Sequence, residues 1–167
     1  MPLEREQVTL CYIERGGCYL MLHRVKKQQD VNKDKWIGVG GSFEEGEDAL
    51  GCVVREAWEE TGLRLTSPVY RGIVDFYCPP WPPERMHLYT CPEGGYEGDA
   101  DHLPDCNEGV LEWVPVEDVD KLPIWEGDRI FFRLIAENAP FFHLELYYDG
   151  DRLTRAVLNG ADLTKEE

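Results

Sequence analysis

The sequence lacks the features that mark membrane-spanning and exported proteins. Its 167 residues contain no apolar run of membrane length and no basic-then-apolar leader. The six cysteines include no C-x-x-C pair, so we expect reduced thiols in a soluble, cytoplasmic protein. The alternative is a zinc site, which nothing in the residue spacing supports, built from Cys78, Cys91 and Cys106 with His87 or His102.

Basic residues are also scarce. The chain has 17 Lys and Arg against 33 Asp and Glu, which gives a formal net charge of −16. This charge repels anionic partners over long distances, so we expect no binding to a nucleic-acid polymer or to an anionic membrane. The basic residues that do occur are concentrated in one stretch, where they can bind the phosphates of a small molecule: Arg24, Lys26, Lys27, Lys33 and Lys35.

The most informative stretch covers residues 40–63, GGSFEEGEDALGCVVREAWEETGL. The segment from Asp48 to about Thr61 is typical of a helix, because Asp48 is a favourable N-cap and Gly62 a favourable residue just past the C-terminus. Apolar residues recur at three-to-four spacing and predict its buried stripe: Leu50, Val53, Val54 and Ala57.

Three glutamates of this helix indicate a metal site. Helical spacing places Glu56, Glu59 and Glu60 together on the side opposite the apolar stripe. Their carboxylates repel one another, so the cluster indicates a counter-charge supplied from outside, and Mg²⁺ is commonly held by carboxylates, waters and substrate phosphates. Gly40 and Gly41 allow a tight turn close to a ligand, so that a main-chain carbonyl can join the coordination.

Two further charged residues can support these glutamates. Arg55 precedes Glu56 and lies one turn before Glu59, where its guanidinium can hold a carboxylate in place. Glu47 lies at the helix start, where negative charge is favoured and Arg55 is within reach. The alternative interpretation is an acidic amphipathic helix whose charges only face water.

Taken together, these residues resemble the signature of the Nudix hydrolases. Every fixed position is matched, and only Ala57 departs from the larger aliphatic residue that is more usual there. The resemblance implies an α/β fold, an α/β/α sandwich around a mixed β-sheet, and the length predicts a single domain over residues 1–167. It also implies that Mg²⁺, or Mn²⁺ as a substitute, assists cleavage of a nucleoside diphosphate linked to another group.

The remaining elements follow from periodicity and turn residues. We expect strands at 7–14, 17–24, 36–40, 69–78, 85–91, 110–114, 142–149 and 152–158. Loops are expected at 25–35, at the prolines of 79–83 and at 92–107, with a short turn or helix at 116–122. A second helix at 127–138, with Asp128 as its N-cap, is expected to pack on the sheet opposite the first.

The resemblance also assigns roles outside the helix. In Nudix enzymes that cleave nucleoside triphosphates, an acidic residue on a loop before a tryptophan-containing strand binds metal or abstracts a proton. Glu108, five residues before Trp113, is the match, with Glu112 and Asp105 as rivals. The predicted metal ligands are therefore the Gly40 carbonyl, Glu56, Glu59, Glu60 and Glu108, and either Glu59 or Glu108 is the general base.

Features along nearly the whole chain resemble the MutT-like 8-oxo-dGTP diphosphatases. They are the segment 36–41, the strand 72–76, the helix start at 125–128 and the closing hairpin. In mammalian members, a tryptophan and two adjacent acidic residues at this helix start bind the base. The resemblance thus assigns base binding to Trp125, Asp128 and Phe76. The alternative places Trp125 in the core and makes Asp128 only a helix cap.

Two positions depart from that branch. Gly127 occupies the first acidic position, and Ile37 replaces an asparagine that contacts the purine edge. A site with fewer polar groups discriminates less, which leaves the preferred base open. With Arg24 and Lys35 as phosphate contacts, we expect hydrolysis of a nucleoside triphosphate to the monophosphate and pyrophosphate. The alternatives are another substrate, such as a dinucleoside polyphosphate or nucleotide sugar, and a non-catalytic nucleotide sensor; the oligomeric state stays open.

Overall fold

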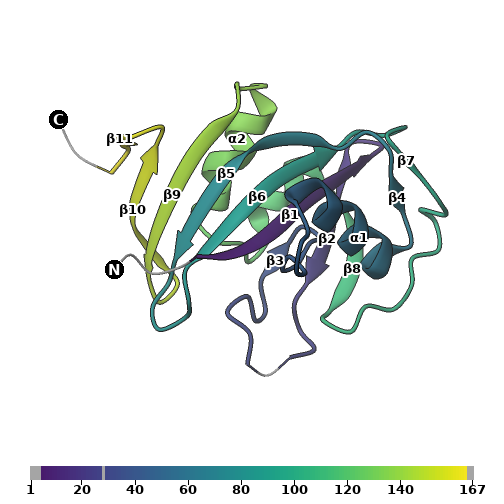
Figure 1. Ribbon diagram of the computed structural model, residues 1–167, viewed down its shortest axis with the longest axis horizontal. Helices are drawn as coiled ribbons and strands as arrows, with labels where there is room; N and C mark the ends of the chain where they lie inside the picture. Colours follow the sequence, from purple (N-terminus) through teal and green to yellow (C-terminus); the bar gives the residue numbers. More distant parts are fainter. Residues whose placement is uncertain (1–4, 28, 165–167) are drawn as a thin grey trace.

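A mixed β-sheet forms the centre of the molecule in a computed structural model that describes residues 5–27 and 29–164. The strand order of this nine-stranded sheet is β11-β10-β9-β5-β6-β1-β2-β3, and β8 also pairs with β2 (Figure 1). The strands are β1 (Glu6–Arg15), β2 (Cys18–His23), β3 (Trp36–Ile37), β5 (Val69–Tyr77), β6 (Glu84–Cys91), β8 (Val110–Pro115), β9 (Phe142–Asp149), β10 (Arg152–Leu158) and β11 (Ala161–Asp162). The pairs β1–β6 and β5–β9 are parallel and the others antiparallel.

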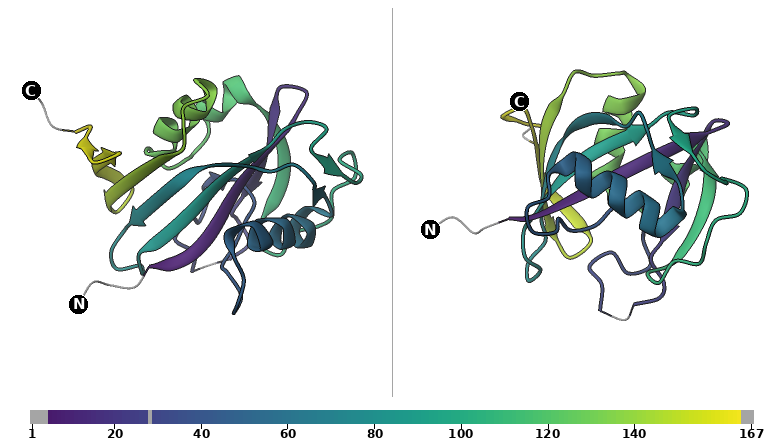
Figure 2. Two further views of the ribbon diagram at one scale, coloured as in Figure 1. Left: turned by 45° about the horizontal axis from the view of Figure 1, so that its top comes forward. Right: turned by 45° about the vertical axis from the view of Figure 1, so that its right-hand side comes forward.

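Helices cover both faces of the sheet. The helix α1 (Ala49–Thr61) lies on one face and α2 (Asp128–Ala136) on the other, as Figure 2 shows. The short 3-10 helix η1 (Val116–Lys121) precedes α2. This arrangement confirms the predicted α/β/α sandwich. Among the described residues, no helix is long and apolar enough to cross a membrane.

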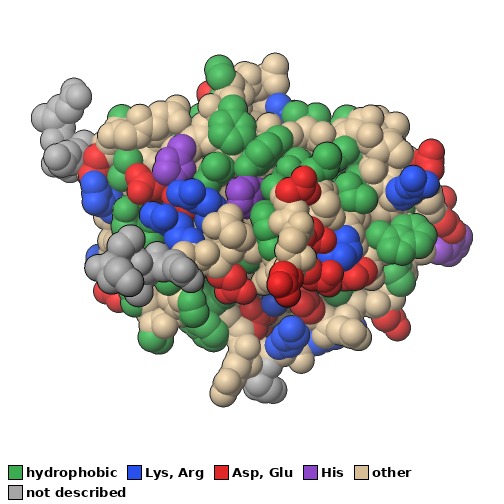
Figure 3. All heavy atoms as spheres, in the orientation of Figure 1, with side chains coloured by type: hydrophobic (Ala, Val, Ile, Leu, Met, Phe, Trp, Pro, Cys, Tyr) green, Lys and Arg blue, Asp and Glu red, His purple; other side chains and the backbone are tan. Residues whose placement is uncertain are grey.

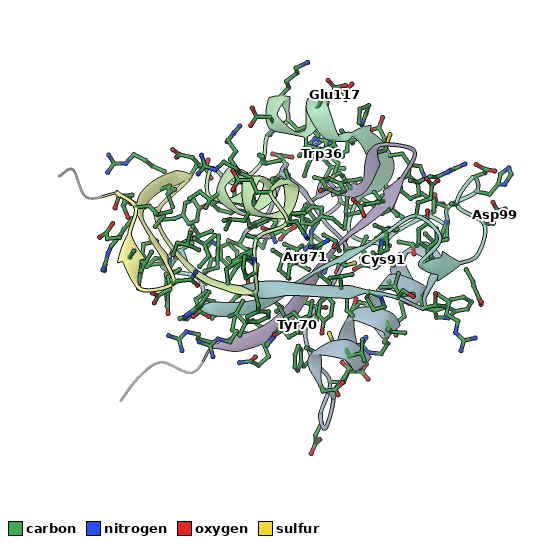
Figure 4. The ribbon with its side chains drawn as sticks, turned by 90° about the horizontal axis from the view of Figure 1, so that it is seen from above. Trp36, Tyr70, Arg71, Cys91, Asp99 and Glu117 are labelled. Atoms are coloured by element: carbon green, nitrogen blue, oxygen red, sulfur yellow. The ribbon has the colours of Figure 1, made fainter. Side chains whose placement is uncertain are left out.

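The alternation of side chains explains why β1 is apolar throughout. Leu10 and Tyr12 belong to the core on the α2 side, whereas Cys11 and Ile13 belong to the core on the α1 side. A strand with both faces covered needs apolar residues at consecutive positions. A register shift in β5 leaves Tyr70 on the α1 side and Arg71 on the α2 side (Figure 4).

Two elements differ from the sequence prediction. The expected loop 92–107 contains a strand, β7 (Tyr96–Glu97), that pairs with β4 (Arg64–Leu65) in a separate two-stranded sheet. These segments are too short and polar to give a periodic signal. The predicted N-cap at the second helix was also wrong, because Asp128 is already helical and Gly127 caps the helix without a side-chain hydrogen bond.

Candidate active site

Both ends of α1 are fixed by the residues that the sequence predicts. Asp48 Oδ1 accepts a hydrogen bond from the Gly51 N–H at 2.7 Å, and Gly62 ends the helix in the left-handed region with φ of 73°. The predicted apolar stripe was partly wrong, since Leu50 is 52% exposed and the packed residues include Val53 and Ala57.

The three glutamates of α1 lie on one side of the helix, as the sequence predicts, but differ in exposure. Glu60 is 8% exposed, whereas the side chains of Glu56 and Glu59 are 16% and 54% exposed. Glu60 and Glu56, one turn apart, face the turn before the helix, and Glu59 lies nearer to solvent. A buried carboxylate without a cation is costly, so this placement needs a compensating charge.

Two glycines bring the backbone of that turn against the carboxyl groups. The Gly40 N–H donates a hydrogen bond to Glu60 Oε2 at 3.3 Å. A Cβ atom at Gly41 would lie 2.6 Å from the Glu56 carboxyl group, and one at Gly40 would lie 1.9 Å from the Thr9 carbonyl oxygen. A side chain at Gly40 would overlap the backbone of β1, whereas one at Gly41 would displace the Glu56 carboxyl group.

Arg55 connects the acidic residues of the turn and the helix. Its guanidinium donates to both carboxylate oxygens of Glu47, at 2.8 and 2.9 Å, which is the contact that the sequence predicts. The same group reaches Glu56 at 2.9 Å and Glu59 at 3.1 Å. The hydrogen bonds from Arg55 lower the pKa of Glu47 to about 2. Arg55 thus fixes the carboxylates in position and neutralises part of their charge.

A second set of ion pairs lies across from α1. Glu108 accepts a hydrogen bond from Arg24 at 2.8 Å and lies 3.4 Å from Lys27 Nζ. Arg24 also donates to Asp30 at 2.8 Å. Acidic side chains gather on and below α1, with basic side chains beside them (Figure 3). The structure therefore brings Glu108 and Arg24, which are far apart in sequence, to the same region.

Three adjoining cavities run through this region. The acidic cavity, of about 280 Å³, is lined by Glu56, Glu59, Glu60, Asp105 and Glu108 among others. The central cavity, of about 310 Å³, shares Glu56 and Glu108 with it and adds Arg24, Lys27, Gly40 and Met86. The outer cavity, of about 200 Å³, shares Arg24, Lys27 and Glu84 with the central one and adds Phe76 and Trp81. Acidic, basic and apolar side chains thus follow one another in space along these three cavities.

The acidic cavity has the donor set of a hard divalent cation. Burial, together with the nearby Glu108 and Glu56, raises the pKa of Glu60 to about 9, and burial also raises the pKa of Glu56. Within residues 5–27 and 29–164, no three Asp, Glu, His or Cys side chains are arranged to hold an ion. Instead, Arg55 binds the Glu56 carboxylate, and Arg24 and Lys27 bind the Glu108 carboxylate. Carboxylate oxygens around a buried acid still fit Mg²⁺, since a cation can replace the proton that burial favours.

The residues assigned to base binding are buried beside the cavities. Trp125 and Asp128 are each 4% exposed, and burial raises the pKa of Asp128 to about 8. Trp125 Nε1 donates to Asn32 Oδ1 at 2.8 Å, and Asn32 lines the central cavity. Phe76 contacts the edge of Trp125 and lines the outer cavity. The Lys35 carbonyl accepts a hydrogen bond from the Arg24 N–H, but the Lys35 side chain lies over the Trp125 ring, with Nζ 4.6 Å from its centroid.

Several residues of the cavities escaped the sequence analysis. Asp30 and Asn32 belong to a polar loop whose spacing gives no signal, and Lys27 was one of several equivalent lysines. Glu84 is the first residue of β6, one position before the predicted strand. The only sequence signal that Glu84 lines the cavity was its spacing of two residues from Met86, because alternate residues of a strand share one face.

Comparisons with known proteins agree with this geometry. A model of the NUDIX domain matches residues 4–135. A Nudix hydrolase of Bacillus subtilis, YvcI, is 27% identical over 140 residues, which are 83% of this chain and 84% of that protein. The oxidized purine nucleoside triphosphate hydrolase of Mus musculus is 24% identical over 142 residues, 81% of this chain and 85% of that protein.

Solved structures of MutT-like proteins also resemble this chain. The mutator MutT protein of Bacillus halodurans superposes with a TM-score of 0.76 at 27% identity, covering 92% of this chain and 97% of that one. Nudix hydrolases use divalent metal cations and act on small nucleotide substrates, which is the chemistry that the acidic and central cavities accommodate. The chain therefore belongs to the Nudix family and is a MutT-like Nudix hydrolase.

Proposed function

We propose that this enzyme is a Mg²⁺-dependent diphosphatase that hydrolyses a nucleoside triphosphate to the monophosphate and pyrophosphate. An oxidised purine nucleotide of the 8-oxo-dGTP kind is the first candidate substrate. The observation that carries the proposal is the order of the cavities, in which an acidic cavity opens directly into one that holds Arg24, Lys27 and apolar side chains. Phosphates bound by these cations would lie beside the glutamates.

Each group of residues has a distinct task in this reaction. Glu56, Glu59, Glu60 and Glu108 of the acidic cavity would hold Mg²⁺ or Mn²⁺, together with the carbonyl of Gly40, which lines the adjoining central cavity. When bound, the ion neutralises phosphate oxygens and acidifies the attacking water. Arg24, which lines the central cavity, would bind the phosphate chain, and Lys35, which lies over Trp125, is the less favourable phosphate contact.

The water attacks the α- or β-phosphorus and forms one P–O bond, while the bond from that phosphorus to the oxygen bridging the α and β phosphates breaks and releases pyrophosphate or the monophosphate as the leaving group. The proton of the water passes to a carboxylate, and both Glu59 and Glu108 border the acidic cavity. Arg55 holds Glu56 and Glu59, and Glu47 in turn holds Arg55, so these two residues position the carboxylates.

The base would occupy the apolar part of the central cavity, beside Ile37 and Met86. Trp125, which donates to Asn32, and Phe76, which packs against Trp125, adjoin this part, and with the buried Asp128 they would bind the base if the loop carrying Asn32 moved outward. The resemblance to the oxidized purine nucleoside triphosphate hydrolase of Mus musculus supports a purine substrate.

A second candidate substrate has its own support. The outer cavity continues beyond the central one and provides about 200 Å³ lined by Phe76 and Trp81. This space could receive the further group of a dinucleoside polyphosphate or a nucleotide sugar.

A product-release screen tests the proposal. Purified protein with Mg²⁺ is incubated with normal and oxidised nucleoside triphosphates, nucleotide sugars and dinucleoside polyphosphates, with the Glu60→Gln variant as a control for contaminating hydrolases. We expect pyrophosphate from a purine nucleoside triphosphate, in the cytoplasmic pH range and at millimolar Mg²⁺. Release from the dinucleoside polyphosphate or sugar alone selects the second candidate, and no release from any compound favours a nucleotide sensor.

A further inference from the structure

Glu84 lies in the substrate cavities without a role in the chemistry described above. It begins β6 and is flanked in register by Phe76 of β5 and Glu6 of β1. Because side chains alternate along a strand, Glu84 shares its face with Met86 and Leu88, which is the face covered by α2. Its carboxyl group lines both the central and the outer cavity.

The carboxyl group of Glu84 has no protein partner that explains its position. It makes neither a hydrogen bond nor an ion pair with any residue of the described ranges 5–27 and 29–164, although the residue is only partly exposed to water. The residue directly across from it on β1 is another acid, Glu6, and like charges at paired positions destabilise a sheet. Burial and the charge of Glu6 raise the pKa of Glu84 to about 7.

The surroundings of Glu84 suit the edge of a flat ring. Ile37 and Met86 offer apolar contacts in the central cavity, and Phe76 does so in the outer one. Other polar side chains of these cavities already have protein partners, since Arg24 donates to Asp30 and Glu108 and Asn32 accepts a hydrogen bond from Trp125. A polar group beside apolar side chains fixes the orientation of a ligand, and an acceptor without a donor is costly.

We infer that Glu84 selects the base of the substrate by accepting two hydrogen bonds from a ring amide N–H and the amino group beside it. Guanine and pterin rings carry this pair of donors, whereas adenine and hypoxanthine do not. A carboxylate offers two acceptor oxygens that match the two donors in parallel. The inference rests on the proposed nucleotide hydrolysis and adds the class of base.

Paired nucleotides test this contact. GTP and ITP differ only in the amino group, so the ratio of their kcat/KM values isolates one hydrogen bond to Glu84. For the wild type we expect a preference for GTP of roughly 10- to 100-fold, the range for a hydrogen bond to a charged group. Glu84→Ala should reduce the ratio to about 3 or less, and Glu84→Gln, which keeps one acceptor, to an intermediate value.

A matched control makes the same chemical change elsewhere. Glu145 lies on β9 between Leu144 and Leu146, which belong to the core on the α2 side, so its side chain is on the opposite face of the sheet. Glu145→Gln should keep the wild-type ratio. Removal of Glu84 also relieves its repulsion with Glu6, so the variants should fold, as thermal unfolding would verify.

Binding separates this inference from the proposed catalysis. Isothermal titration with GMP and IMP measures the same amino group without turnover, so an inactive protein still gives an answer. Equal affinity of the wild type for GMP and IMP, or a preference that survives Glu84→Ala, would overturn the inference while leaving the hydrolase proposal intact. Dihydroneopterin triphosphate distinguishes the two ring types, because a higher kcat/KM that also depends on Glu84 assigns the site to a pterin.

Discussion

Replacement of Gly41 by alanine should reduce catalysis while leaving the fold intact. The added Cβ would lie 2.6 Å from the carboxyl carbon of Glu56, whereas ordinary contacts begin at 3.4 Å. The carboxyl group must therefore retreat by roughly 1 Å, and a misplacement of that size can cost about 100-fold in rate. Because the atoms that move are the end of a flexible side chain, the free energy of unfolding should change by less than about 1 kcal/mol.

The neighbouring glycine provides the opposite control. A Cβ at Gly40 would lie 1.9 Å from the backbone oxygen of Thr9, in a strand that cannot yield without moving the sheet. Gly40→Ala should therefore lower the free energy of unfolding by about 3 kcal/mol or more, which is roughly 6–12 °C in Tm for a chain of this size.

Two measurements decide the matter. Pyrophosphate release at several Mg²⁺ concentrations gives kcat/KM, and circular dichroism gives the Tm of each variant. We expect Gly41→Ala to keep its Tm, to lose about two orders of magnitude in kcat/KM and to need more Mg²⁺ for half-maximal rate. A Gly41→Ala enzyme with wild-type kcat/KM would show that the position of Glu56 is not important for the reaction.

The remaining predictions concern the glutamates, the metal and a buried acid. Glu59→Gln and Glu60→Gln should each lower kcat by at least roughly 100-fold at unchanged Tm, and near-wild-type rates would refute their roles. EDTA should abolish pyrophosphate release, and excess Mg²⁺ should restore it; activity that persists in EDTA contradicts the metal site. Although burial opposes it, hydrogen bonds from Arg85 and His143 lower the pKa of Asp75. The stability from this lowered pKa is therefore present above about pH 4 and is lost as the pH falls further. Arg85→Met should cost about 2–4 kcal/mol at pH 7 and make the Tm less dependent on acid, and an unchanged Tm would contradict this.

Local patterns of the sequence were sufficient to predict the framework of the enzyme. The ends of α1 follow from Asp48 and Gly62, and the hairpin between β9 and β10 follows from Asp149 and Gly150, because these residues act through neighbouring backbone groups. The contact between Glu47 and Arg55 was also predictable, since both belong to one short segment with a regular geometry.

Contacts between distant segments could not be predicted in the same way. The orientation of α1 about its own axis depends on how it packs on the sheet. Leu50 is therefore exposed and Glu60 buried, which the apolar periodicity of the helix did not predict. The ion pair between Glu108 and Arg24 joins positions 84 residues apart, and nothing in either segment specifies the other. Lys35 was grouped with Arg24 by sequence proximity, but the turn of the loop places it over Trp125.

Crystallography with Mn²⁺ and a non-hydrolysable nucleoside triphosphate tests the central claim most directly, because the anomalous signal of manganese locates the ion independently of the protein atoms. We predict a peak in the acidic cavity within coordination distance of Glu56 and Glu60, with the phosphate chain extending toward Arg24. A bound nucleotide without any peak there, and with these two carboxylates turned away from its phosphates, would contradict the account.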